Sequence, residues 1–504
     1  MDFRSSDTGP PCRHRNVLRQ LTGTGPGSEV RSAASKRYSE STSGSDFVTD
    51  RNTPALTQFG EFAVTAVVPQ EARAAACNAV LDTVGVMLAG SMEPAARLVR
   101  DVARAEGGAP RCSVFGTGDR TGAGWAALAN GTAAHALDFD DMCFVSMAHP
   151  SAPLVAAGLA AAELAEADGA ALLDAFCVGF EIEAVLGRTM NPTHYEQGWH
   201  ATATLGTVGA AATAARLLGQ DAATVTRSMA IAASEASGLK ESFGTMVKPL
   251  QAGLAGRNGV LAAQLADAGC TATANAIDGG QGMLVAMRSC DRKVNESILK
   301  LGHVWEIVDN GITVKLYPSC AATHPTIDTL LDLRDKHGFG AADVEAVEVV
   351  VDSVTPTVLI HDCPQSGLEG KFSMHFCAAS ALAHGRVDIS TFEPCGLADP
   401  VTQALVPRVT MRSDAAVGVG QPALTEALVT VRLRDGGTFA RRVQGARGYP
   451  ANPPTDDQLS QKFLACAGRV VSPQTANEAL TWLRGLESQP KVSGLVDLLS
   501  AVTA

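Results

Sequence analysis

Aromatic residues and long apolar stretches are both scarce in this sequence of 504 residues. Phe, Trp and Tyr make up only 5% of the chain, although hydrophobic residues make up 46% of it and alanine is abundant. Because small side chains let helices approach closely, this composition predicts a core of tightly packed helices. No run of 18 uninterrupted apolar residues is present, so we expect no transmembrane helix and no membrane partner.

An excess of positive charge is also missing. The formal net charge is -12, which argues against a protein that binds nucleic acid. The negative total does not exclude an anionic small molecule, because a binding site needs only local positive charge.

Closely spaced cysteines are absent as well. The chain has 12 cysteines, but no two lie within four residues of each other, so the CxxC pairs typical of zinc and redox sites are missing. We interpret most of them (among them Cys77, Cys177, Cys270 and Cys466) as small reduced core residues of a cytoplasmic protein, with disulfides as the alternative. No HExxH motif is present either, and we predict neither a metal nor a cofactor.

Residues 1–52 differ in composition from the rest of the chain. They are rich in Ser, Gly, Thr and Arg and lack apolar periodicity, so we predict a disordered N-terminal tail. A transit peptide is the alternative, because the segment is rich in Arg and Ser and poor in acids.

Helical periodicity begins at Pro69 and dominates as far as residue 311. In the segment from Pro69 to Gly90, the apolar residues fall near helical spacing, and Gly90 is a stop signal. After Pro453 and Pro454 the pattern is helical again. We therefore predict one discontinuous all-helical domain, formed by residues 53–311 and 453–504. Further helices are expected at about 94–106, 122–137, 152–167, 170–189, 201–218, 221–236 and 250–268, with Ser151 as an N-cap.

Residues 312–452 have a different pattern. The segment VEAVEVVVDS (344–353) is β-branched and typical of a strand, and 424–445 predicts two strands joined at Asp435-Gly436-Gly437. A helix is expected between them, near 371–384. The predicted fold class is therefore mainly α, with a large helical domain and a smaller α+β lid domain.

Ionisable residues interrupt the apolar pattern in HALDFDDMCFVSMAHPSAP. Asp138, Asp140 and Asp141 follow the end of an expected helix, and His149 precedes the next one. The spacing allows Asp138 and His149 to form a carboxylate–imidazole pair, in which the acid orients the imidazole and raises its basicity. The alternative is an acidic loop after a helix and a His that only caps the next helix.

Three further segments carry candidate site residues. His200 opens a helix of small residues in GWHATATLGTVGAA, and Lys248 precedes Pro249 at the start of another helix. A lysine at a helix N-terminus is unfavourable for the helix but suits a bound anion, although a solvated lysine is the alternative. The third segment, TVKLYPSCAATHPTID, lies at the boundary of the two predicted units, where ligand clefts are common. Its candidate residues are Lys315, Tyr317, Cys320 and His324, and a polar linker or a Cys–His protease pair are alternatives.

Taken in this order, the segments resemble the MmgE/PrpD family, which contains 2-methylcitrate dehydratases, cis-aconitate decarboxylases and iminodisuccinate epimerases. The resemblance covers about 58–500. It is carried by HALDFDD, HPS at 149–151, GWHATATLGTVGAA, KPLQAGLAGRNG and KLYPSC. It implies a homodimer of two-domain subunits, an active site between the domains, and catalysis without a metal or an organic cofactor.

The resemblance also implies which residues form the active site. The positions that match those of the family are Asp138, His149, His200, Lys248 and Lys315. The sequence departs from the family pattern at three positions. Met142 stands where the dehydratases and decarboxylases often have Thr, Cys320 stands where animal decarboxylases have His, and no Tyr is found near Ile360.

Together these observations predict a lyase of the 2-methylcitrate dehydratase type that acts on a small di- or tricarboxylate. We expect His149 and His200 to transfer protons beside a carboxylate and Asp138 to orient one of them. Lys248, Lys315 and Cys320 are expected to contact the substrate. An epimerase or racemase of a dicarboxylate is the second candidate, and a cis-aconitate-type decarboxylase is the third. The alternative outside enzymes is a helical scaffold that binds carboxylates.

Overall fold

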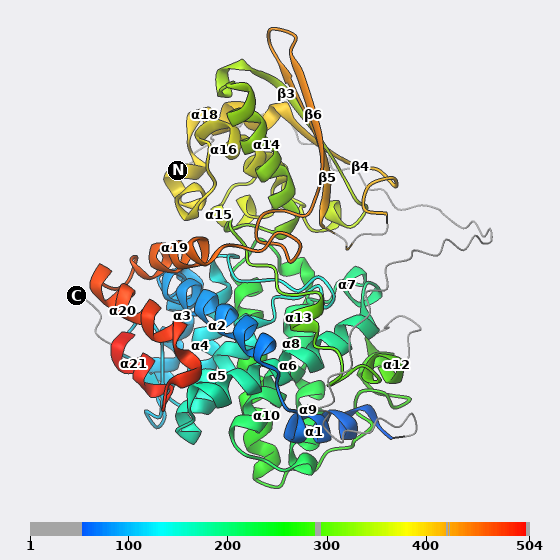
Figure 1. Cartoon of the computed structure of the whole chain (residues 1–504), viewed down its shortest axis with the longest axis vertical. Helices are drawn as coiled ribbons and strands as arrows, with labels where there is room; N and C mark the ends of the chain where they lie inside the picture. Colours follow the sequence, from blue (N-terminus) through cyan, green and yellow to red (C-terminus); the bar gives the residue numbers. More distant parts are fainter. Residues whose placement is uncertain (1–52, 288–293, 420–421, 423, 500–504) are drawn as a thin grey trace, which may run out of the picture. The chain divides into compact units, whose positions relative to one another are not determined.

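Helices make up most of the part of the chain that the computed structural model describes, namely residues 53–287, 294–419, 422 and 424–499 (Figure 1). The predicted tail, residues 1–52, lies outside these residues. The two short strands β1 (Cys112–Ser113) and β2 (Arg120–Thr121) pair antiparallel. The helices up to residue 311 are α1 (Ala55–Thr65), α2 (Gln70–Gly90), α3 (Pro94–Glu106), α4 (Ala123–Ala136), α5 (Ser151–Ala165), α6 (Gly169–Met190), α7 (Thr193–Glu196), α8 (Ala201–Leu217), α9 (Ala222–Glu235), α10 (Val247–Asp267), α11 (Met283–Ala286), α12 (Val294–Ile298) and α13 (Glu306–Asp309).

Small residues allow α10 to pack closely against both α4 and α8. A Cβ atom added at Gly131 of α4 would lie only 2.8 Å from the Cα atom of Gly253 in α10. On the other side of α10, a Cβ atom added at Gly259 would lie 2.6 Å from the Cβ atom of Ala210 in α8. The predicted core of closely packed helices is therefore present, and it places the end of α4 and the starts of α8 and α10 together.

The C-terminal half contains a four-stranded mixed sheet in the order β4-β3-β5-β6. β3 (Val344–Val351) pairs parallel with β4 (Val409–Ser413) and antiparallel with β5 (Glu426–Leu433), which forms the predicted hairpin with β6 (Thr438–Gln444). Figure 1 shows α14 (His324–His337) and α16 (Met374–His384) together on one face of this sheet. The remaining helices of this part are α15 (Gly367–Gly370), α17 (Pro394–Leu397) and α18 (Pro400–Leu405). The predicted fold class, mainly α with a smaller α+β part, is confirmed.

The last helices are α19 (Asp456–Ala467), α20 (Pro473–Arg484) and α21 (Ser493–Leu499), and the first of them packs against α2. A buried ion pair joins these two helices, since Lys462 Nζ lies 2.7 Å from an oxygen of Asp82. The C-terminal segment therefore contacts the first helices of the chain, while the exact domain boundaries stay a prediction. α2 is also long and apolar enough to cross a membrane, but 72% of its most apolar stretch is buried inside the protein, as in a core helix.

Several details differ from the sequence-based expectations. Ser151 is the first residue of α5 and not its N-cap, because the preceding Pro150 takes that position. Cys270 was expected in the core but is exposed, since it lies in the loop after α10. No disulfide joins any two of the ten described cysteines. β4 and α14 were not predicted from the sequence.

Candidate active site

The centre of the candidate site is the turn that follows α4. Asp138 lies just beyond the helix end and has a φ of 50°, in the left-handed region that costs a non-glycine residue about 1–2 kcal/mol. Its buried carboxylate accepts one hydrogen bond from Lys248 Nζ at 2.5 Å and another from Lys315 Nζ at 2.9 Å. These two ammonium groups compensate the unfavourable backbone conformation and fix the direction of the carboxylate.

Two opposing effects act on the pKa of Asp138. Burial alone would raise it, but the charges of Lys248 and Lys315 more than offset burial and hold the pKa well below its usual range. Asp138 is therefore a permanent carboxylate at neutral pH. Since two ammonium groups face one carboxylate, the centre keeps an excess of positive charge.

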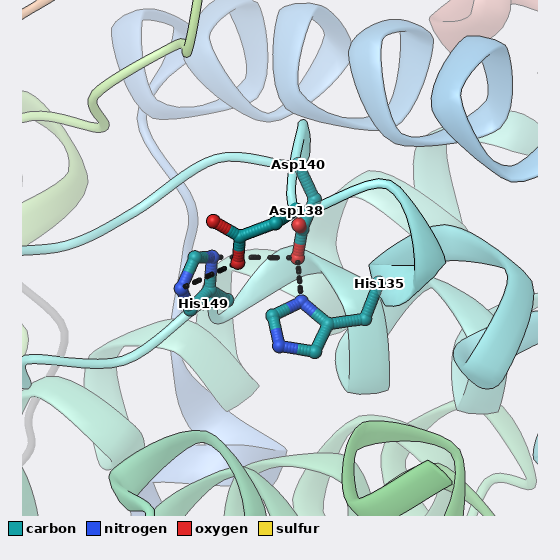
Figure 2. Close-up of side chains that lie close together, drawn as sticks. All are labelled: His135, Asp138, Asp140 and His149. Carbon is teal, nitrogen blue, oxygen red and sulfur yellow. Dashed lines mark hydrogen bonds and ion pairs between the residues drawn. The ribbon is translucent and has the colours of Figure 1, made fainter. Parts of the chain in front are cut away.

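Asp140 orients an imidazole on the other side of the turn, as Figure 2 shows. His135, on the last turn of α4, has Nδ1 at 2.8 Å from Asp140 Oδ2 and Nε2 at 2.7 Å from Lys248 Nζ. Because an ammonium group can only donate, Nε2 of His135 accepts, and Nδ1 carries the proton that is donated to Asp140. Burial lowers the pKa of His135, in agreement with this neutral form.

His149 lies beside the same two carboxylates (Figure 2). Its Nδ1 is 3.5 Å from Asp140 Oδ2 and its Nε2 is 3.9 Å from Asp138 Oδ1, so both approaches are longer than a normal hydrogen bond. Its backbone N–H donates to the hydroxyl of Thr202 in α8 at 2.9 Å. Burial and then the charges of two nearby lysines hold the pKa of His149 well below its usual range, so the ring is neutral.

His200 is the N-cap residue of α8, and one of its nitrogens has no protein partner. Its Nδ1 lies 2.6 Å from Oε1 of Gln251, whose amide nitrogen donates to the carbonyl of Leu239 and so fixes the amide orientation. Nδ1 therefore carries the proton, and Nε2 keeps a free lone pair. Within the described part of the chain, this buried Nε2 accepts no hydrogen bond. Burial, and then the charge of Lys248, hold the pKa of His200 well below its usual range.

These side chains surround an enclosed cavity of about 20 Å³, which is room for about one water molecule. A small di- or tricarboxylate, the substrate class expected from the sequence, does not fit in this space, so the described conformation is a closed one. Three of the four described non-glycine residues with positive φ lie on its wall, and strained backbone of this kind clusters at functional sites. The lining residues are Asp138, Met142, Met147, His149, Tyr195, His200, Phe243, Lys248, Cys320, Ala321, Val358, Phe372 and Leu424.

A much larger cavity, of about 560 Å³, lies elsewhere and is a weaker candidate. Its lining includes amide side chains such as Asn191 and Asn310, and the one charged lining residue, Arg188, forms an ion pair with Glu306. Chemistry needs titratable groups that face each other, and of these two cavities the small one has them.

The structure brings most of the predicted site residues together, but not all in the expected roles. Asp138, His149, His200, Lys248 and Cys320 line the cavity. Lys315 is fully buried behind Asp138, where its ammonium group binds the Asp138 carboxylate and backbone carbonyl. Asp138 was expected to orient His149 or His200, but its oxygens bind lysines and its approach to His149 Nε2 is 3.9 Å. Asp140 instead holds an imidazole at hydrogen-bond distance, that of His135.

Two polar residues of the site were missed from the sequence. Gln251 is three residues after Lys248 in α10, so these two lie on the same helix face. His135 is three residues before Asp138 in HALDFDD, on the last turn of α4, and so lies next to the turn that carries Asp138. That spacing was the signal that would have found them. Conversely, Ile360 is 52% exposed and does not line the cavity, where Val358 lies instead. His324, suggested as a partner for Cys320, binds the backbone carbonyl of Ser319.

The cluster drawn in Figure 2 also has the donor types of a metal site. One ligand atom from each of His135, Asp138, Asp140 and His149 lies within 4.8 Å of the others. However, both oxygens of Asp138 already accept from ammonium groups, and a metal ion would have to displace them or face their charge. The residues therefore fit an anion better than a cation, and the absence of a metal stays a prediction.

Two family profiles match this chain. The profile of the MmgE/PrpD N-terminal domain matches residues 56–294, and that of the MmgE/PrpD C-terminal domain matches residues 317–487. The two matches cover every residue that lines the candidate cavity.

Individual relatives extend over most of the chain. The cis-aconitate decarboxylase-like protein oryM of Aspergillus oryzae is 28% identical over 462 residues, which cover 86% of this chain and 94% of the relative. The human cis-aconitate decarboxylase is 26% identical over 430 residues (83% and 88%), and that of Aspergillus terreus is 24% identical over 412 residues (77% and 84%). On the two domain matches, the chain belongs to the MmgE/PrpD family.

Proposed function

We propose that this protein is a lyase that acts on a small di- or tricarboxylate, and that His200 moves a proton at a carbon beside a carboxylate. The observation that carries the proposal is the free Nε2 of His200, a neutral imidazole in a buried cavity that also contains the ammonium group of Lys248. A base with a free lone pair beside a fixed cation is what proton transfer to or from an enolate requires.

The charge balance around the cavity supports an anionic substrate. Lys248, Lys315 and Lys371 are buried near the cavity, against the carboxylates of Asp138 and Asp140, so positive charge is in excess while the histidines are neutral. The carboxylates of a bound substrate would be stabilised by this excess of positive charge. They would also raise the pKa of the neighbouring imidazoles, because negative charge favours the protonated form.

Decarboxylation of the cis-aconitate type is the first candidate reaction, supported by the names and the coverage of the relatives. In this reaction the bond between the leaving carboxylate and its carbon breaks, and carbon dioxide leaves. The electron pair moves through the double bond to the carbon beside another carboxylate. That carbon then takes a proton from Nε2 of His200, which must be protonated at this stage, a form that the bound carboxylates favour. Lys248 stabilises the enolate charge that forms in between.

Dehydration of the 2-methylcitrate type, which the sequence favoured, is the second candidate. It is supported by Cys320, which lines the cavity at a position where animal decarboxylases have His. In a dehydration His200 would remove the proton beside a carboxylate, and hydroxide would leave from the next carbon. Epimerisation of a dicarboxylate would use the same first step and return the proton on the opposite face. Each of these reactions uses only side chains of the protein, so we propose that neither a metal nor an organic cofactor is needed, and that the enzyme acts as a homodimer.

A substrate screen in heavy water tests the proposal. The full chain is incubated separately with cis-aconitate, 2-methylcitrate, citrate and iminodisuccinate, and the products are followed by NMR. A decarboxylase releases carbon dioxide and gives a product with one deuterium, a dehydratase gives an unsaturated acid, and an epimerase incorporates deuterium without loss of carbon. If no acid is converted and none exchanges a proton for deuterium, the lyase proposal is wrong and a binding scaffold is favoured.

A further inference from the structure

The turn after α4 is held by three buried lysines, which bind three successive backbone carbonyls. The lysines come from segments that are far from the turn in the sequence: the boundary region, the residue after α15, and α19. The pairs are Lys371 Nζ with Leu137 O at 2.7 Å, Lys315 Nζ with Asp138 O at 3.1 Å, and Lys462 Nζ with Phe139 O at 2.7 Å.

This turn needs partners from outside its own helix. The last carbonyl groups of a helix receive no hydrogen bond from the backbone N–H groups of that helix. The helix C-terminus also carries the negative end of the helix dipole. Asp138 also needs such partners, because its left-handed backbone conformation is unfavourable and persists only when surrounding residues hold it. The direction of Asp138, and with it the position of Lys248, therefore depends on the three lysines.

Lys371 differs from the other two lysines in its partners. Lys315 forms an ion pair with Asp138, and Lys462 forms one with Asp82. Lys371 has no carboxylate within ion-pair distance among the described residues, and its ammonium group donates only to two carbonyls, those of Leu137 and Pro318. A buried ammonium group without a carboxylate is unfavourable, and such groups cluster where function requires them.

The contacts of Lys371 also join the two sides of the cavity. Its side chain reaches the turn after α4, while its backbone carbonyl accepts from the N–H of Cys320 at 3.0 Å. The next residue, Phe372, lines the cavity together with Cys320. One residue therefore connects the turn that carries Asp138 with Cys320 and Phe372 of the cavity lining.

We propose that Lys371 is a positioning residue, which holds the Leu137–Phe139 turn in the conformation that the reaction needs and does not itself touch the substrate. That the reaction needs this conformation rests on the proposed function, whereas the effect of Lys371 on the turn is independent of it.

Burial lowers the pKa of Lys371 to about 8, so its charge is sensitive to mildly alkaline pH. Above that value the amine loses its proton, and its hydrogen bonds to the two carbonyls lose the extra strength that the charge gives. We therefore expect turnover to fall as the pH rises through about 8. The titratable groups that act on Lys371 are Asp138 and Glu93, Lys315 and Cys377.

The test compares Lys371→Met with the unaltered enzyme by hydrogen exchange and by kinetics. Exchange of a peptide covering 134–143 should be at least about 10-fold faster in the variant, while peptides of α8 exchange as before. With the substrate found in the acid screen, kcat should fall by about 100-fold, the usual cost of a displacement of about 1 Å, and KM should change much less. The alkaline limb near pH 8 should disappear, because the titrating amine is gone.

The exposed Lys336, at the end of α14, provides a matched control. Lys336→Met removes the same charge and should leave exchange, kcat and the pH profile unchanged. Unchanged exchange of the turn in Lys371→Met would overturn the proposal, as would a loss of kcat that only follows a lower melting temperature.

Two further measurements keep the proposal testable if Lys371→Met does not fold. Lys371→Gln can still donate from its amide, and should show a smaller increase in exchange at the turn. In the unaltered enzyme, exchange of 134–143 relative to α8 should increase between pH 7 and pH 9, and a constant ratio would count against the proposal. Exchange needs no substrate, so an enzyme inactive towards every acid would refute the proposed function and leave this inference standing.

Discussion

The two sides of the candidate cavity differ in chemistry. The side formed by residues before 311 contributes every carboxylate, imidazole and ammonium group of the lining. Lys248 lies on α10, and the other three, Asp138, His149 and His200, lie just after α4, before α5 and before α8. The side formed by later residues contributes one thiol, and otherwise only apolar side chains such as Val358, Phe372 and Leu424. Burial raises the pKa of the Cys320 thiol to about 11, so even this group is neutral.

The difference suggests a division of work between the two sides. The helical side has fixed, charged groups whose mutual hydrogen bonds set their direction, as catalysis requires. The C-terminal side offers shape and apolar surface, which select among substrates but cannot move a proton. Substitutions on the helical side should therefore reduce turnover, and those on the other side should mainly change substrate preference.

The largest effect is expected from loss of an imidazole on the helical side. His200→Ala should lower kcat by about 10²–10⁴-fold, the usual contribution of general acid–base catalysis, and His149→Ala should fall in the same range if the two share proton transfer. His337→Ala, at the exposed end of α14, is the control and should be fully active. Near-normal turnover in His200→Ala, with the correct substrate, would remove this residue from the mechanism.

Lys248→Ala should have the next largest effect. The variant loses the ammonium group that bridges His135 and Asp138, and should lose about 2–4 kcal/mol of transition-state stabilisation, measured as kcat/KM. The melting temperature should be recorded in parallel, because the change also leaves a cavity. A drop in kcat/KM below about threefold would mean that the helical side does not stabilise the anion through this lysine.

The pH dependence of kcat/KM should show a smaller effect, which comes from the ionisation of His200 on the helical side. In a dehydration or an epimerisation His200 first acts as a base, which works in its unprotonated form, and the pKa of His200 in the free enzyme lies well below 6.5. For these reactions we expect kcat/KM to be constant between about pH 6.5 and 7.5 and to decline only at lower pH. In a decarboxylation His200 donates the proton, so kcat/KM should instead fall as the pH rises from about 6.5 to 7.5. An acidic limb centred at pH 7 would show that the imidazole is less buried during the reaction than in this structure.

A substitution on the C-terminal side should change preference more than rate. Cys320→Ser keeps the size and neutrality of the side chain, and should alter kcat by less than about 10-fold. Cys320→His introduces the residue of the animal decarboxylases, and should shift the ratio of kcat/KM values between cis-aconitate and 2-methylcitrate towards the former. Equal losses for both acids would mean that Cys320 contributes to the chemistry itself.

We expect a chelator to have no effect on turnover. Because ammonium groups already occupy the oxygens of Asp138, we predict that incubation with EDTA leaves kcat unchanged. Activity that is lost to EDTA and restored by zinc, magnesium or iron would show that the cluster around His135 and Asp140 binds a metal.

The fold was predictable wherever residues close together in the sequence determine the structure. Helical periodicity and the Asp435-Gly436-Gly437 turn were sufficient for the long helices and for the β5–β6 hairpin. β4 was not found because it has five residues, is largely exposed, and pairs parallel with a strand some sixty residues earlier, a contact that no local pattern encodes.

The sequence was sufficient to predict which segments form the site. It was not sufficient to predict which side chains bind each other there. Asp138 and Asp140 have the same side chain two residues apart, yet one binds two lysines and the other binds the imidazole of His135. That assignment depends on Lys315, which is 177 residues away from Asp138, and on how α10 approaches α4. His135 was overlooked because it sits in an alanine-rich helix, where a lone His is usually structural.

The closed cavity has a consequence for measured affinities. If only a fraction of the molecules is open enough to admit a six-carbon acid, the apparent dissociation constant equals the intrinsic one divided by that fraction. An open population of about 1% would weaken apparent binding about 100-fold, or by about 2.7 kcal/mol. A weak binding constant would therefore measure how rarely the roughly 20 Å³ cavity widens, and not how well its charges hold a bound substrate.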